Sequence, residues 1–185
     1  MYRTVVLLFL FISFGCSKKE KADMVNYEKI VSHRNKGLAY LEEENFTEAE
    51  KEFKLLTVLA PQDPLGFANL GLTYLKSEGQ LHKSEKWLEK ALDLNQKHPE
   101  IRMLLALYYE LNNQDSLAFN ILKKTIKYSP NHVKTLYKLT EYYLKENDLN
   151  SKKIAQLYLK NIIKIIPANI VVQLDLIEIL LNENK

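Results

Sequence analysis

Residues 67–74 read Phe67-Ala68-Asn69-Leu70-Gly71-Leu72-Thr73-Tyr74, and the pattern of this run recurs along the chain. Its closing tyrosine returns every 34 or 35 residues, with a small residue three positions before it. The tyrosines are Tyr40, Tyr74, Tyr109 and Tyr143, and the residues three positions earlier are Gly37, Gly71, Ala106 and Thr140. A fixed period of this length predicts a stack of structural repeats.

Each period also contains a second small residue, a bulky apolar residue four positions after it, and a helix-ending position. In chain order the small residues are Ala49, Ser84, Ala118 and Ala155, and the bulky residues are Phe53, Leu88, Leu122 and Leu159. The helix-ending positions hold Pro61, Gln96, Pro130 and Pro167. Because proline lacks the backbone donor that a continuing helix needs, and because the apolar spacing is helical, each period predicts two packed helices.

This set of positions resembles the tetratricopeptide repeat (TPR), with units at 30–63, 64–98, 99–132 and 133–169. The resemblance implies an all-α fold, a right-handed α-solenoid of about four helical hairpins with a capping helix at 170–185. Extra residues near Gly79 and Ser151 are expected in loops between paired helices. A non-repetitive helical bundle and another family of helical hairpins are the alternatives.

The first residues have the pattern of an export signal, with an apolar run of about a dozen residues that is short for a membrane span. The run ends at Gly15-Cys16 and resembles a bacterial lipoprotein signal, which implies cleavage after residue 15 and lipidation of Cys16 with acyl chains such as palmitate. Residues 16–26 would form a polar tether and 27–185 the repeat domain. Ser17 after the cysteine favours the outer over the inner membrane, with the domain facing the periplasm or the cell surface. A plain secretory signal and an uncleaved anchor are the alternatives.

Composition and motifs argue against several classes of function. The net charge of +3 is too small to predict a nucleic-acid partner, and a single cysteine allows no disulfide framework. The four histidines are scattered, and no metal-binding, nucleophile-elbow or phosphate-loop motif occurs. We therefore expect no enzyme activity, no cofactor and no metal.

The TPR resemblance implies a partner-binding groove lined by the first helix of each hairpin, with an apolar centre and polar ends. The residues that map to it are Arg34, Asn35, Asn69, Leu72, Met103, Leu104, Leu107, Lys134, Tyr137 and Lys138. Basic and amide residues among them resemble the carboxylate clamp of cochaperones, but Glu100 and Leu104 stand where that clamp needs basic residues. An extended or helical peptide with apolar side chains is the preferred ligand, and simple packing of the leucines is the alternative.

The segment 170–181 is apolar around most of its circumference when projected as a helix. Val172, Leu176 and Ile179 are therefore expected to meet a second copy, a partner or the chain's own groove, or else to tuck onto the fourth hairpin as a cap. Taken together, the sequence predicts a membrane-anchored scaffold that docks another protein or peptide of the bacterial cell envelope, in the context of envelope assembly. The alternative is a self-associating subunit that uses its apolar C-terminal helix.

Overall fold

The computed structural model describes residues 24–146 and 148–183, and every regular element in these ranges is a helix. Residues 24–42 form the first described helix. The others are α2 (Phe46–Leu59), α3 (Pro64–Lys76), the short 3₁₀ turn η1 (Leu81–Lys83), α4 (Ser84–Leu94), α5 (Pro99–Leu111), α6 (Asp115–Tyr128), α7 (Val133–Glu146), α8 (Leu149–Ile165) and α9 (Ile170–Glu183).

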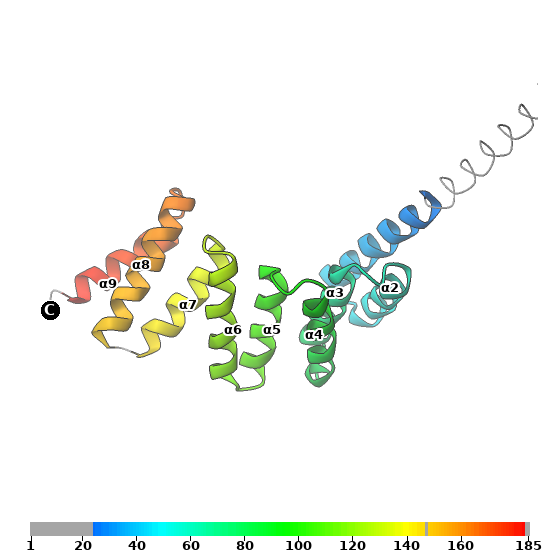
Figure 1. Cartoon of the computed structure of the whole chain (residues 1–185), viewed down its shortest axis with the longest axis horizontal. Coiled ribbons are helices and arrows are strands. Elements are labelled where there is room, and N and C mark those ends of the chain that lie inside the picture. Colours follow the sequence, from blue (N-terminus) through cyan, green and yellow to red (C-terminus); the bar gives the residue numbers. More distant parts are fainter. Residues whose placement is uncertain (1–23, 147, 184–185) are drawn as a thin grey trace, which may run out of the picture.

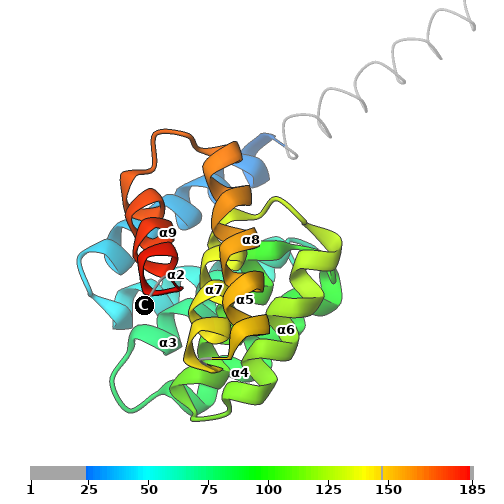
Figure 2. The same cartoon turned by 90° about the vertical axis from the view of Figure 1, so that its left-hand side faces the viewer.

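The helices form antiparallel hairpins that stack side by side into an elongated solenoid (Figure 1). Within hairpins α3 packs on α4, α5 on α6 and α7 on α8, while α2–α3, α4–α5, α6–α7 and α8–α9 contacts join neighbouring hairpins. Figure 2 shows the solenoid from its C-terminal end, where α8 and α9 lie nearest the viewer. The all-α solenoid predicted from the repeat is thus the observed fold.

Helix boundaries follow local chemistry. Asp63 accepts a 2.9 Å hydrogen bond from the Leu65 amide, and Pro64 occupies the first turn of α3, where its missing N–H costs nothing. Helices α2, α6 and α8 end two residues before the prolines singled out in the sequence, at Leu59, Tyr128 and Ile165. Proline therefore separates one hairpin from the next.

The small residues let the two helices of a hairpin approach closely. A Cβ atom placed on Gly37 would lie 2.6 Å from Cε1 of Phe53, and one on Gly71 would lie 2.6 Å from Cδ2 of Leu88. Both distances are far shorter than van der Waals contact. Ser84 Oγ also donates a 2.8 Å hydrogen bond to the Gly71 carbonyl, which fixes the start of α4 against α3.

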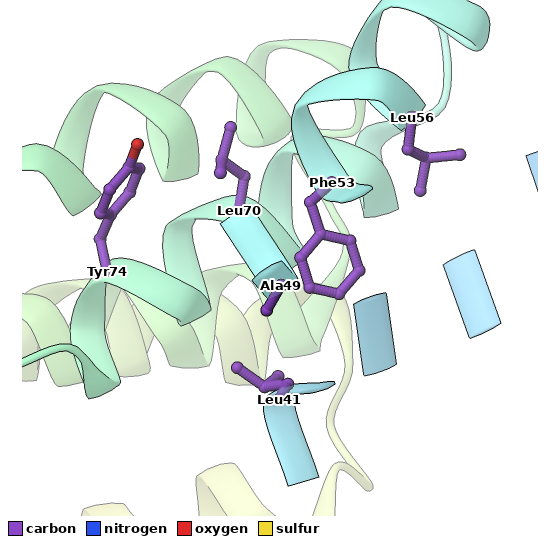
Figure 3. Packing of buried hydrophobic residues seen from close by; sticks show 6 residues of the cluster. All are labelled: Leu41, Ala49, Phe53, Leu56, Leu70 and Tyr74. Carbon is purple, nitrogen blue, oxygen red and sulfur yellow. The ribbon is translucent and has the colours of Figure 1, made fainter. Parts of the chain in front are cut away.

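The core is a series of clusters, each shared by successive helices. In the first cluster, Leu41, Phe53 of α2 and Leu70 of α3 are buried together with Ala49, Leu56 and Tyr74 (Figure 3). Phe53, Leu56 and Leu70 have no exposed surface. Because each hairpin leaves one apolar side for its neighbour to cover, stability comes from the stack.

The two regions of extra residues differ. Around Gly79, whose φ is +70°, the chain forms a loop followed by η1, as expected for an insertion. Around Ser151 the prediction of a loop is wrong, because α8 begins at Leu149 and Asp148 caps it by accepting hydrogen bonds from the Asn150 and Ser151 amides. The extra residues lengthen α8 at its start.

Helix α9 lies on the fourth hairpin. Val172 is only 2% exposed and packs with Leu136 of α7 and Leu159 and Ile162 of α8, while Leu176 and Ile179 are partly buried against the same cluster. Helix α9 therefore packs on the fourth hairpin as a cap, which is one of the alternatives that the sequence left open. The three residues lie inside the chain's own fold, so the free surface of α9 is on its opposite side.

Candidate functional site

Two hollows of about 550 Å³ and about 240 Å³ adjoin on one side of α5, α7 and α9. They share Met103, Lys134 and Lys138, so they form one continuous surface. We call this surface the groove. Its lining residues are Glu100, Met103, Leu104, Ala106, Leu107, Glu110, Leu122, Val133, Lys134, Tyr137, Lys138, Asn169, Val171 and Val172.

Helical spacing explains why α5 presents apolar side chains to the groove. Ile101, Leu105 and Tyr108 are buried on one side of the helix, in contact with neighbouring helices. Leu104 and Leu107, three positions apart, lie together on the groove side, where Leu107 is 38% exposed. The floor of the groove is therefore apolar and open to a ligand.

The two groove lysines are paired with carboxylates. Lys134 Nζ lies 3.1 Å from both carboxylate oxygens of Glu100, and Lys138 Nζ lies 3.3 Å from Glu110 and 2.9 Å from Glu141. Their positive charges are thus already balanced within the chain. Lysines of a carboxylate clamp need to be available to the ligand, so this pairing argues against that mode of binding.

The ion pairs shift the pKa values of the groups that form them. Burial alone would raise the pKa of Glu100, but hydrogen bonds from Lys134 and His132 hold it below the ordinary value. Burial would lower the pKa of Lys138, yet the Glu141 hydrogen bond and the Glu110 charge raise it. Both groups stay charged at neutral pH, so the pairing persists there.

Tyrosines anchor two further carboxylates beside the groove. Tyr142 donates a 2.8 Å hydrogen bond to Glu110, and Tyr137 donates a 3.0 Å hydrogen bond to Asp175 of α9. Burial and the Glu110 hydrogen bond raise the pKa of Tyr142, while the Asp175 hydrogen bond followed by burial raises the pKa of Tyr137. These phenols therefore stay protonated and keep the carboxylates in place.

The rim of the groove is acidic on balance. Glu100, Glu110, Glu141 and Asp175 supply four carboxylates within or beside it, and Lys134 and Lys138 supply two ammonium groups. Excess carboxylates around an apolar floor favour a ligand with apolar side chains and positive charge.

The groove includes part of the set predicted from the sequence. The predicted residues that line it are Met103, Leu104, Leu107, Lys134, Tyr137 and Lys138. Arg34, Asn35, Asn69 and Leu72 lie on earlier helices and are not among its lining residues. Arg34 instead forms a 2.6 Å ion pair with Asp63, and Leu72 packs against the first core cluster.

The sequence analysis did not include Glu110, Val171 and Asp175 in the site. Counting from the start of each unit, Glu110 is position 12, while Val171 and Asp175 are positions 2 and 6 of a fifth unit that begins at Ile170. Applying the same register to α9 would have found the last two. The ion pair between Glu110 and Lys138 and the hydrogen bond between Asp175 and Tyr137 could not be predicted from the sequence.

The histidines take structural roles where the structure gives them partners. His33 Nδ1 lies 2.6 Å from Glu52, and His132 contacts Thr135 and Glu100. In the described ranges, no three metal-ligating side chains converge. None of the helices described is both long enough and apolar enough to cross a membrane.

Comparison with known proteins identifies the family and the fold. Residues 19–162 match the family model of the ChAPs, the Chs5p-Arf1p-binding proteins. Among curated proteins, none matches this sequence.

Several solved structures share the fold. The thermophilic TPR protein TTC0263 of Thermus thermophilus superposes with a TM-score of 0.68 at 18% identity, covering 97% of this chain and 96% of its own. YrrB, a TPR protein with an unusual peptide-binding site, gives a TM-score of 0.57 at 18% identity, with 92% and 86% covered. The TPR2B domain of yeast Sti1 in complex with an Hsp70 peptide gives 0.53 at 17% identity, with 72% and 96% covered. The fold is therefore TPR-like.

Proposed function

The chain belongs to the ChAPs family, and from this premise we propose that it is a protein-docking module whose groove takes an apolar, positively charged segment of a partner protein. The observation that carries the proposal is the groove itself, with an apolar floor at Leu104 and Leu107 and a surplus of carboxylates at its rim. The family is named for binding two proteins, and a TPR-like fold is typical of protein–protein interaction, which supports docking as the class of function.

The chemistry of the groove defines the partner segment. Leucine-like side chains would bury against Met103, Leu104 and Leu107, and lysine or arginine side chains would approach Glu100 and Glu110. Because the groove crosses three helices, an extended strand or one helical face of a peptide fits it. The acidic rim disfavours an anionic C-terminal segment of the kind that a carboxylate clamp holds.

The test uses the full-length chain and two synthetic peptides that share a leucine-rich core, one flanked by lysines and one by glutamates. We expect the lysine-flanked peptide to bind more tightly, and Leu107→Asp to weaken it about tenfold or more because a carboxylate would enter the apolar floor. Val58→Asp on α2, whose native side chain is 77% exposed, is the matched control and should bind as the wild type does. Equal affinity for both peptides, or no effect of Leu107→Asp, would refute the proposal.

We also propose that a lipid on Cys16 holds the module at a membrane of a bacterial cell envelope, the outer membrane rather than the inner, where the docked partner is an envelope protein. Residues 1–23 lie outside the described ranges, so the support for this comes from the sequence, where the only cysteine ends the apolar run. Mass spectrometry of the membrane-extracted protein should find acyl chains on residue 16. Cys16→Ser should release the protein from the membrane fraction, and unchanged attachment of this variant would exclude lipidation as the anchor.

A further inference from the structure

Helix α9 presents a continuous apolar stripe on the side opposite to its core contacts. Ile170, Leu174, Ile177 and Leu181 are 67%, 59%, 50% and 61% exposed. Their spacing of four, three and four residues is that of helices that pair along a seam. No charged residue interrupts the stripe. Helix α9 itself lies at the end of the solenoid that faces the viewer in Figure 2.

The stripe differs from the corresponding surface of the other first helices. The position that holds Gly37 and Gly71 in the first two hairpins is occupied in α9 by Ile177. At Gly37 and Gly71 the second helix of the hairpin comes so close that an added Cβ would clash with Phe53 or Leu88. The larger side chain of Ile177 would prevent a helix from packing on α9 as closely as α2 and α4 pack at these glycines. The stripe therefore suits a partner helix at the larger separation at which side chains interlock.

Charge indicates what that partner is. Helix α8 carries Lys152, Lys153, Lys160 and Lys164 and no acidic residue, whereas α9 carries acidic residues and no lysine or arginine. Within the described ranges, Lys160, Lys164 and Glu178 form no ion pair. One end of this chain therefore displays both an anionic helix and a cationic helix, each the complement of the other.

A hollow on α8, next to the core side of α9, also combines apolar and cationic side chains. It measures about 670 Å³ and is lined by Leu157, Lys160 and Lys164 of α8 and by Leu176 of α9, among others. Leu157 is 63% exposed, so α8 contributes apolar surface of its own at this end of the solenoid, and Lys160 and Lys164 line the same hollow. An acidic, leucine-rich helix fits such a site.

We propose that this end of the solenoid is a homodimer interface, in which α9 packs on α9 of a second copy of the chain across a two-fold axis. The apolar stripes meet at the centre, and Glu178 of each copy faces Lys160 and Lys164 of the other. In a two-fold dimer the same surface of both copies forms the interface. This surface suits such an arrangement because its apolar stripe can pack on itself and because it carries both charges of the proposed ion pairs. The groove on α5 and α7 remains free for its own ligand.

The first experiment is sedimentation equilibrium of the full-length chain in a mild non-ionic detergent. The wild type should show a protein mass of twice that of one chain, as mass spectrometry of the same preparation gives it, and Leu174→Lys with Ile177→Lys should raise the dimer dissociation constant by about tenfold or more. Val58→Lys is the matched control on another exposed apolar residue. A monomeric wild type overturns the proposal, as does a dimer that the α9 variant leaves unchanged.

Charge exchange tests the partner directly. Glu178→Lys should weaken the dimer, and adding Lys160→Glu and Lys164→Glu to it should restore the dimer. In a Cys16→Ser background, Ile177→Cys should form a disulfide between two copies on mild oxidation, while Val58→Cys should not. Absence of both the rescue and the cross-link would contradict the two-fold arrangement. Circular dichroism of each variant verifies that it is folded, and peptide binding in the groove is expected to be unchanged throughout.

Discussion

The phenol of Tyr137 on α7 donates a 3.0 Å hydrogen bond to Oδ2 of Asp175 on α9. This bond holds α9 against the fourth hairpin on the groove side. On the core side, α9 is held by the apolar packing of Val172. Helix α9 is thus fixed from two directions, which gives both the groove and the apolar stripe a defined position.

Tyr137→Phe should loosen α9 without unfolding the other helices. The variant leaves Asp175 without this donor, so we expect a loss of about 1 kcal/mol in the free energy of unfolding. Hydrogen exchange of the α9 amides should become faster, and exchange in α5 should not change. Tyr27→Phe, at a residue that is 66% exposed, is the control. Equal protection of α9 in both variants would show that the hydrogen bond is not needed for docking.

Gly71→Ala should destabilise the fold although alanine is the better helix former. The new Cβ would lie 2.6 Å from Leu88, so either the side chain or the backbone has to move, at a cost of about 1–3 kcal/mol. Urea unfolding gives the value. Leu88→Ala in the same chain makes room, so the double variant should lose less stability than the sum of the two single variants. Additive losses would mean that the two positions are not in contact.

Stability should fall in alkali through Tyr109. Burial and hydrogen bonding to Glu85 raise its pKa from 10.0 to about 12, so the phenol ionises in the unfolded chain before it does so in the folded one. Its contribution is complete below pH 10 and is lost as the pH rises towards 12. Thermal unfolding between these pH values should therefore depend less steeply on pH in Tyr109→Phe than in the wild type. Identical slopes would contradict the raised pKa.

Lys134→Ala should strengthen the binding of the lysine-flanked peptide. The change removes an ammonium group that neutralises Glu100, so the rim becomes more acidic. Lys134 is 68% exposed at its side chain, and the surface ion pair contributes at most about 1 kcal/mol, so the fold should keep its stability. Titration calorimetry at low and high salt compares the affinities, and the gain should shrink with added salt. Weaker binding by this variant would instead favour a clamp for anionic peptides.

The sequence allowed the solenoid to be predicted because the positions that build it are local and periodic. Gly71 and Tyr74 indicate where the two helices of one hairpin pack closely, and Pro61 indicates where the preceding hairpin ends. For α9 the sequence singled out the side with Val172, Leu176 and Ile179 but left open what that side meets, since apolar residues surround most of the helix and their pattern does not distinguish core from interface. Val172 proved to face inward and Ile177 outward.

The candidate site was predictable in part for a similar reason. Met103, Leu104 and Leu107 follow from the register of a first helix, which repeats along the chain. Ion pairs such as that between Lys138 and Glu110 depend on the distance between two helices and on side-chain conformations, which a single sequence does not specify. Arg34 illustrates the same limit, because its partner Asp63 lies in a loop 29 residues away.

The contacts between helices have a kinetic consequence. Each described helix packs mainly on the helices before and after it in the chain, so the contacts that form the native fold span short loops. Folds with such local contacts close in roughly microseconds to milliseconds, because little loop entropy is lost before each contact forms. Each hairpin can therefore join the stack as soon as its neighbour has formed, and the docking surfaces on α5, α7 and α9 are complete only when the fourth hairpin and α9 are both in place.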